Sequence, residues 1–178
     1  TEIYTLSLHD ALPISERASP TPMPPRALLD LATELLRSLL RFDAPADAVV
    51  SAFFRRQRAL GPRERHTLAE TAYAVLRRRL TLQHLAQGGR GAIERRLAIL
   101  GWQGDAGFLR AALADDEREW LDRIAQVDRA SLPARLRHEL PAWIAEALQA
   151  GFGADFDALA ASLLEPAPLD LRVNALAT

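Results

Sequence analysis

The chain has 178 residues, 49% of them hydrophobic, and its 22 basic and 23 acidic side chains give a net charge of −1. This is enough apolar material for a real core, while the total charge argues neither for nor against a nucleic-acid partner. The absence of cysteine excludes disulfides, zinc fingers and thiol nucleophiles. No apolar run approaches the roughly 20 residues that cross a bilayer. We therefore expect no membrane partner and a bacterial cytoplasmic location.

The first 25 residues are not expected to belong to the fold. Residues 1–15 lack the basic start of a secretory signal, and they resemble the translation of a sequencing adapter. Residues 16–25 contain four Pro, which predicts an extended linker. Met23 would then be the true start of the protein.

Apolar residues at helical spacing predict an all-α fold, beginning with a helical bundle over residues 26–130. The first helix is expected over residues 26–41. One face of this helix carries the expected core residues Leu28, Leu31, Leu35, Leu39 and Phe42.

A second helix is expected over residues 46–60, and the pair Gly61-Pro62 separates it from the longest helix, residues 62–87. A long helix with a single apolar stripe is normally central to a bundle, so we expect residues 62–87 at its centre. Shorter helices are predicted over residues 92–102, 108–113 and 115–127.

The C-terminal part, residues 131–178, is expected to hold connecting helices and one strand. Helices are predicted over residues 141–150 and 155–164. Residues 169–173 alternate, with Leu169, Leu171 and Val173 on one side and Asp170, Arg172 and Asn174 on the other, which is typical of a half-buried strand. A lone strand has nothing to pair with, so we expect it to be the first piece of a domain that this chain does not contain.

Charge is distributed unevenly along the chain. Residues 55–96 contain eleven Arg and three Glu, a net charge of +8, whereas residues 141–170 contain five acids and no base. A basic block attracts phosphate, and Arg binds phosphate bidentately, although solvated helix faces would give the same pattern. The candidate RNA-binding residues of this block are Arg55, Arg58, Arg63, Arg65, Arg77, Arg78 and Arg79.

Other residue types give no further site. The G-G-R-G segment at residues 88–91 follows a helix and lacks the spacing of a phosphate-binding loop. The four His are scattered without ligand spacing, so no metal site is expected. We expect Trp102, Trp120 and Trp143 to be core residues rather than base-stacking platforms.

Two stretches resemble known families. Residues 65–79, R-H-T-L-A-E-T-A-Y-A-V-L-R-R-R, resemble the central helix of the NusB-like RNA-binding fold, with Ala74 where that family usually has Gly. L-P-A-W at residues 140–143, G-F-G at 151–153 and P-L-D-L-R-V-N at 168–174 are similar to the beginning of the catalytic part of the Sun/Fmu group of small-subunit ribosomal RNA cytosine-C5 methyltransferases.

The resemblance implies a NusB-like RNA-binding domain over residues 26–130 and the truncated start of a methyltransferase lobe over residues 131–178. It implies ribosomal RNA and the missing C-terminal domain as partners, and S-adenosylmethionine as cofactor of the full-length parent. The two catalytic Cys and the cofactor loop of that family lie further downstream, so we expect this chain to have no catalytic or cofactor-binding residue and to be inactive. Arg172 and Asn174 would approach the RNA-facing surface.

Two alternatives remain open at this point. One is a free-standing NusB-like RNA-binding module in transcription, which would have no use for P-L-D-L-R-V-N. The other is a helical protein-interaction domain whose Arg-rich face meets an acidic partner.

Overall fold

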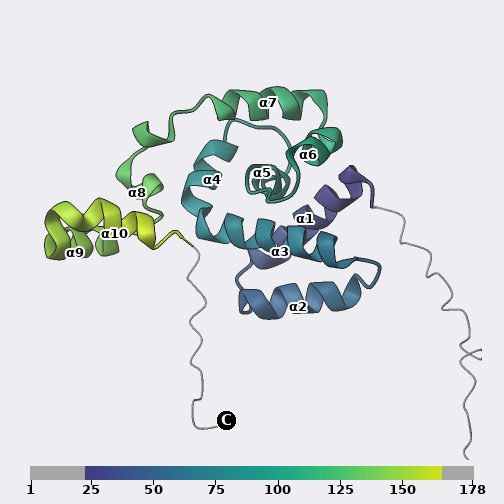
Figure 1. Cartoon of the computed structure of the whole chain (residues 1–178), viewed down its shortest axis with the longest axis horizontal. Coiled ribbons are helices and arrows are strands. Elements are labelled where there is room, and N and C mark those ends of the chain that lie inside the picture. Colours follow the sequence, from purple (N-terminus) through teal and green to yellow (C-terminus); the bar gives the residue numbers. More distant parts are fainter. Residues whose placement is uncertain (1–22, 166–178) are drawn as a thin grey trace, which may run out of the picture.

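The computed structural model describes residues 23–165, and every regular element in that range is helical (Figure 1). The all-α class is therefore confirmed for this part of the chain. The α-helices are α1 (Pro25–Leu39), α2 (Ala46–Arg56), α3 (Pro62–Arg77), α4 (Arg79–Ala86), α5 (Ile93–Leu100), α6 (Ala106–Ala112), α7 (Asp115–Ala125), α8 (Ala134–Arg137), α9 (Ala142–Phe152) and α10 (Phe156–Ser162). Two 3₁₀ turns join them, η1 (Arg129–Ser131) and η2 (Gly153–Asp155).

Some predictions fall outside the described range. The strand predicted over residues 169–173 lies there, and so do Arg172 and Asn174. Within residues 23–165, no helix combines the length and the apolar character that a membrane span requires.

The core is built around α1 and α5. α1 packs against α2, α3, α5 and α6, and five of its leucines are almost fully buried: Leu28, Leu29, Leu35, Leu36 and Leu39. α5 is seen nearly end-on in the middle of Figure 1, with α1, α3 and α4 around it. The prediction that residues 62–87 form one central helix is therefore wrong, because these residues divide into α3 and α4 and the core is built around α1 and α5.

The ends of the first two helices differ from the prediction. α1 ends at Leu39, and Phe42 follows in a turn with φ of 57° and a side chain that is 55% exposed. Phe42 is therefore not a core residue: the chain reverses direction there, and helical spacing stops applying. α2 ends at Arg56 rather than at residue 60, because Gln57 leaves the helical conformation with ψ of 67°.

The predicted long helix is interrupted at Arg78. This residue has φ of −117° and ψ of 34°, so α3 ends at Arg77 and α4 begins at Arg79. The interruption lets α4 turn and pack against α5. Neither Gly nor Pro stands at this point. The interruption is instead stabilised by hydrogen bonds to Glu139, which are described below.

Gly101, the residue that caps the C-terminus of α5, lies against Val75 and Thr71 of α3. A methyl group there would overlap Val75 Cγ2 and lie 3.1 Å from the Leu97 carbonyl oxygen. Val75 is fully buried and its branched side chain has little rotamer freedom. We expect Gly101→Ala to lower the free energy of unfolding by about 2 kcal/mol, measured by chemical denaturation.

Gly151, in α9, provides the matched control, because nothing lies within 4 Å of a methyl group built on it. Gly151→Ala should be neutral or stabilising, since Ala favours the helix over Gly. If Val75→Ala fails to relieve part of the Gly101→Ala loss, crowding against Val75 is not its cause.

Candidate nucleic-acid interface

The break between α3 and α4 is closed by Glu139, which lies almost sixty residues further along the chain. Its carboxylate accepts hydrogen bonds from the backbone N–H of Leu80 (2.7 Å) and of Thr81 (2.8 Å). These are N–H groups of the first turn of α4, which have no partner within the helix. A carboxylate at this position also interacts favourably with the helix dipole.

A third hydrogen bond, not made by Glu139, reinforces the same junction. The hydroxyl of Thr81, which is buried, donates to the carbonyl oxygen of Leu136 in α8. Glu139 itself has φ of 55°, a region that side-chain-bearing residues rarely adopt. The hydrogen bonds of Glu139 and Thr81 hold α8 and Glu139, which lies just after it, against the start of α4. Arg129, a few residues before α8, thereby lines the same hollow as Arg77 and Arg78.

Arg77, Arg78 and Arg129 line a hollow of about 350 Å³ at this junction, here called the basic groove. Gln103 adds a side-chain amide. The other lining residues are apolar or small: Ala74, Leu82, Leu100, Gly101 and Leu164. No acidic residue lines the groove, so its three arginines present a net positive charge to a ligand.

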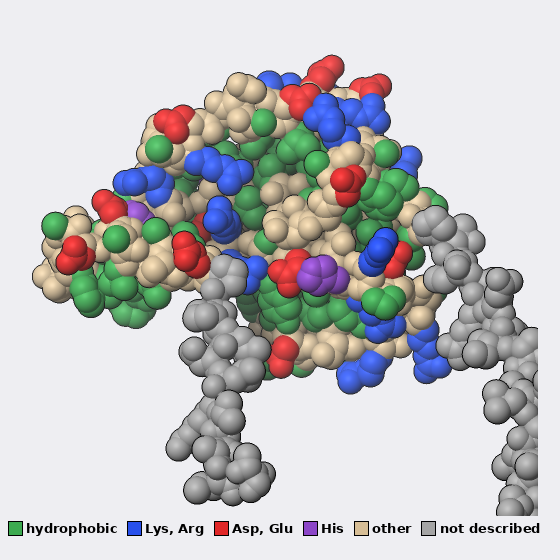
Figure 2. All heavy atoms as spheres, viewed as in Figure 1, with side chains coloured by type: hydrophobic (Ala, Val, Ile, Leu, Met, Phe, Trp, Pro, Cys, Tyr) green, Lys and Arg blue, Asp and Glu red, His purple; other side chains and the backbone are tan. Residues whose placement is uncertain are grey.

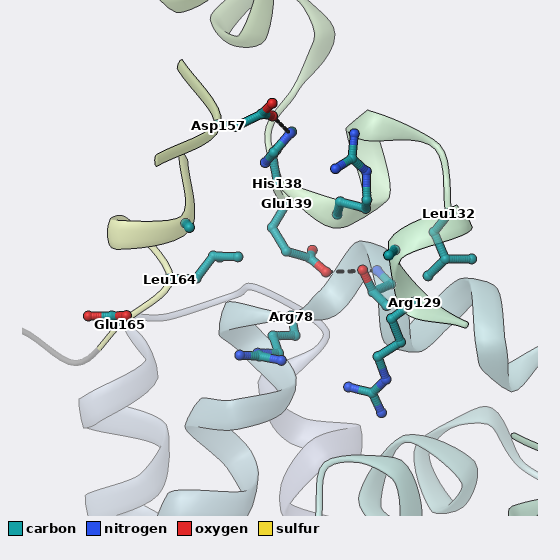
Figure 3. Close-up of a pocket in the computed structure, with 12 residues that line it drawn as sticks. Arg78, Arg129, Leu132, His138, Glu139, Asp157, Leu164 and Glu165 are labelled. Atoms are coloured by element: carbon teal, nitrogen blue, oxygen red, sulfur yellow. Dashed lines mark hydrogen bonds and ion pairs between the residues drawn. The ribbon is translucent and has the colours of Figure 1, made fainter. Parts of the chain in front are cut away.

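The close-up shows how two of these arginines lie. The side chains of Arg78 and Arg129 extend to the same side, away from the carboxylate of Glu139 (Figure 3). Arg77 lies 3.9 Å from Glu70, but both side chains are more than 40% exposed, and such a pair contributes little. The groove therefore fits a group with a negative charge and a flat or apolar part.

A larger hollow of about 500 Å³ adjoins the basic groove and shares Arg78, Arg129 and Leu164 with it. Three acids line it, and two of them are already engaged. Glu139 caps α4, and Asp157 Oδ1 lies 2.8 Å from Nε2 of the buried His138, out of line for a hydrogen bond but close enough for an ion pair when His138 is protonated. Its mixed charge makes it a weaker anion site than the basic groove.

Arg79 has a different neighbour. Its guanidinium carbon lies 4.8 Å from the centre of the Phe42 ring, so the side chain covers one exposed aromatic residue. Of the seven predicted arginines, the three at residues 77–79 are thus brought together at one end of α3.

The remaining four predicted arginines lie at the other end. Arg55, Arg58 and Arg63 are exposed and form no ion pair with another described residue. Arg65 donates to the Leu60 carbonyl oxygen (2.9 Å) and covers the ring of Phe54 (5.6 Å), which is a structural role. Since α3 rises about 1.5 Å per residue, roughly 18 Å of helix separates Arg65 from Arg77.

The +8 block therefore does not form one continuous surface. Figure 2 shows basic side chains spread over several elements, with acidic ones between them. Arg95 pairs with Glu117 (2.5 Å) and with Asp30 (2.9 Å), and the hydrogen bond from Arg95 lowers the pKa of Glu117 below its usual range. Arg96 donates to the Ala86 and Gly89 carbonyl oxygens at the end of α4.

Sequence reasoning missed Arg129, Gln103 and Glu139. Arg129 and Gln103 lie outside the basic block, and nothing in the sequence near Glu139 indicates a contact with residues 80 and 81. The prediction that Trp143 is a core residue is wrong: its side chain is 72% exposed, whereas Trp120 is buried as predicted. Among the described residues, no group of three His, Asp or Glu is arranged to hold a metal ion.

Comparison with known proteins identifies no relative. The sequence matches no model of a protein family, and neither a curated protein nor a solved structure is significantly similar to it.

Proposed function

We propose that residues 23–165 form a NusB-like, RNA-holding region of an S-adenosylmethionine-dependent methyltransferase that modifies cytosine C5 in small-subunit ribosomal RNA. The observation that carries this proposal is the basic groove, which Arg77, Arg78 and Arg129 line and which no acidic residue lines. Arginine at such a place binds phosphate, and contacts to phosphate hold a nucleic acid in register. Methylation of a single base requires that register.

The methyltransferase part of the proposal depends on the sequence resemblance. L-P-A-W, residues 140–143, leads into α9, where Pro141 precedes the first helical residue. G-F-G, residues 151–153, ends the same helix, and Gly153 has φ of 51° and ψ of −116°, a conformation that glycine adopts far more easily than other residues. The cofactor site and the catalytic Cys would come from residues beyond 178, and the residues of the basic groove would only position the RNA.

RNA binding is tested directly with the whole chain. We expect it to bind a single-stranded fragment of small-subunit ribosomal RNA with an affinity that falls steeply with salt. Three phosphate contacts predict a slope of about −2 or steeper in a plot of log affinity against log salt concentration, because each contact contributes about 0.7. A chain that binds no RNA at low salt would contradict the proposal.

The enzymatic context has a separate test, the coding sequence downstream of Thr178. It should encode a methyltransferase domain with two Cys and a Gly-rich cofactor loop. If no such domain follows, the methyltransferase assignment is wrong, and an RNA-binding module without an attached enzyme replaces it.

One observation favours a second candidate, a helical protein-interaction domain. Three large apolar side chains are more than half exposed on or next to α9 and α10: Trp143, Phe152 and Leu163. A surface of this kind fits a protein rather than an RNA partner, because α9 and α10 carry no basic residue. Binding to a protein without any affinity for RNA would favour this candidate.

A further inference from the structure

Phe42 is a large apolar residue whose side chain is exposed to solvent. Its side chain is 55% exposed, and it stands in the turn between α1 and α2 with φ of 57°. Its N–H donates to the Leu39 carbonyl oxygen (3.2 Å), so the turn is hydrogen-bonded. A large aromatic residue is a costly choice for such a turn, where Asn or Gly would adopt the backbone conformation more easily.

The ring has a planar cation beside it. Arg79, the first residue of α4, places its guanidinium carbon 4.8 Å from the ring centre, within the range of a cation–π interaction. Arg79 is exposed as well and forms no ion pair with any of residues 23–165. The turn after α1 and the start of α4 therefore present a ring and a guanidinium side by side at the surface.

Arg79 directly follows Arg77 and Arg78 of the basic groove in the chain, so one member of the pair adjoins two of the phosphate-binding candidates in the sequence. Proteins bind single-stranded nucleic acid with arginines that contact the phosphate backbone and with aromatic side chains on which the bases stack. Every base has a flat face, so this mode needs no particular sequence.

We propose that Phe42 and Arg79 form a stacking platform for one unpaired base of an RNA whose phosphates lie in the basic groove. This inference rests on the proposed function and adds to it a preference for single-stranded over duplex RNA. The surface of α9 and α10 lacks this combination, since its exposed Trp143 and Phe152 have no arginine on the same helices.

The test removes the ring while preserving the turn. Phe42→Asn suits the positive φ and leaves the core unchanged, so the variant should fold as the parent does, which circular dichroism checks. We expect its affinity for a short single-stranded RNA to fall about tenfold, as stacking of one base predicts. The slope against salt should stay unchanged, because no phosphate contact is lost.

Three further measurements separate this inference from the function on which it rests. Phe42→Trp should retain the affinity for single-stranded RNA, and its added fluorescence should be quenched on binding. Phe152→Ala, which removes another half-exposed ring, should bind single-stranded RNA like the parent. Duplex RNA should bind equally to the parent and to Phe42→Asn. If the parent binds single-stranded RNA and Phe42→Asn binds it equally well, the platform is wrong while the RNA-binding function stands; if the parent binds no RNA, both are wrong.

Discussion

Replacing Arg77, Arg78 and Arg129 together by Gln is expected to lower the affinity of the chain for single-stranded ribosomal RNA roughly a hundredfold at low salt. These three side chains line the basic groove, and no acidic residue lines it. The slope of log affinity against log salt concentration should become shallower by about 2, because each lost contact removes about 0.7. Filter binding or fluorescence anisotropy over a range of salt concentrations measures both quantities.

A matched variant removes the same charge elsewhere. Arg55, Arg58 and Arg63 are exposed like the arginines of the basic groove, but they lie toward the opposite end of α3. Unlike Arg77, which lies 3.9 Å from Glu70, they form no ion pair with another described residue. Their replacement by Gln changes the net charge equally and should lower the affinity only a few fold. If both triple variants lose affinity to the same extent, the RNA responds to total charge, and the basic groove is not the binding site.

The helices were predictable because their signals are local. Leucines at helical spacing mark α1, and prolines in the first turns mark the starts of α1 and α3. The same periodicity fails at Phe42, because a turn of positive φ follows α1 and reverses the chain before the next apolar position is reached. Spacing alone does not reveal where a helix stops when no Gly or Pro marks the end.

The basic groove was only partly predictable. Arg77 and Arg78 belong to a visible cluster of charge, but Arg129 is brought to them by a contact between segments almost sixty residues apart. The interruption of the predicted helix at Arg78 has the same origin, since Glu139 supplies the acceptors that residues 76 and 77 would supply in a continuous helix. Contacts of this range leave no periodic signal in the sequence.

Glu139 should therefore be the residue whose loss affects both stability and RNA binding. In Glu139→Ala the N–H groups of Leu80 and Thr81 lose their partner in a partly buried position, and we expect the free energy of unfolding to fall by about 2 kcal/mol. The segment that carries Arg129 would also lose its main polar attachment to α4. RNA affinity should then fall to about that of the single variant Arg129→Gln, while Arg77 and Arg78 still bind.

Three comparisons identify the carboxylate as the cause. Glu139→Gln keeps one acceptor and should lose less stability than Glu139→Ala, since the charge at the helix end is lost but not every hydrogen bond. Glu139→Gly also removes the carboxylate but suits the φ of 55°, so it should be less destabilising than Glu139→Ala by the strain that is relieved. Glu146→Ala, at an exposed position of α9, should change neither quantity. If chemical denaturation shows Glu139→Ala to be as stable as the parent, this cap does not hold α4 in place. Side-chain packing alone would then determine the shape of the basic groove.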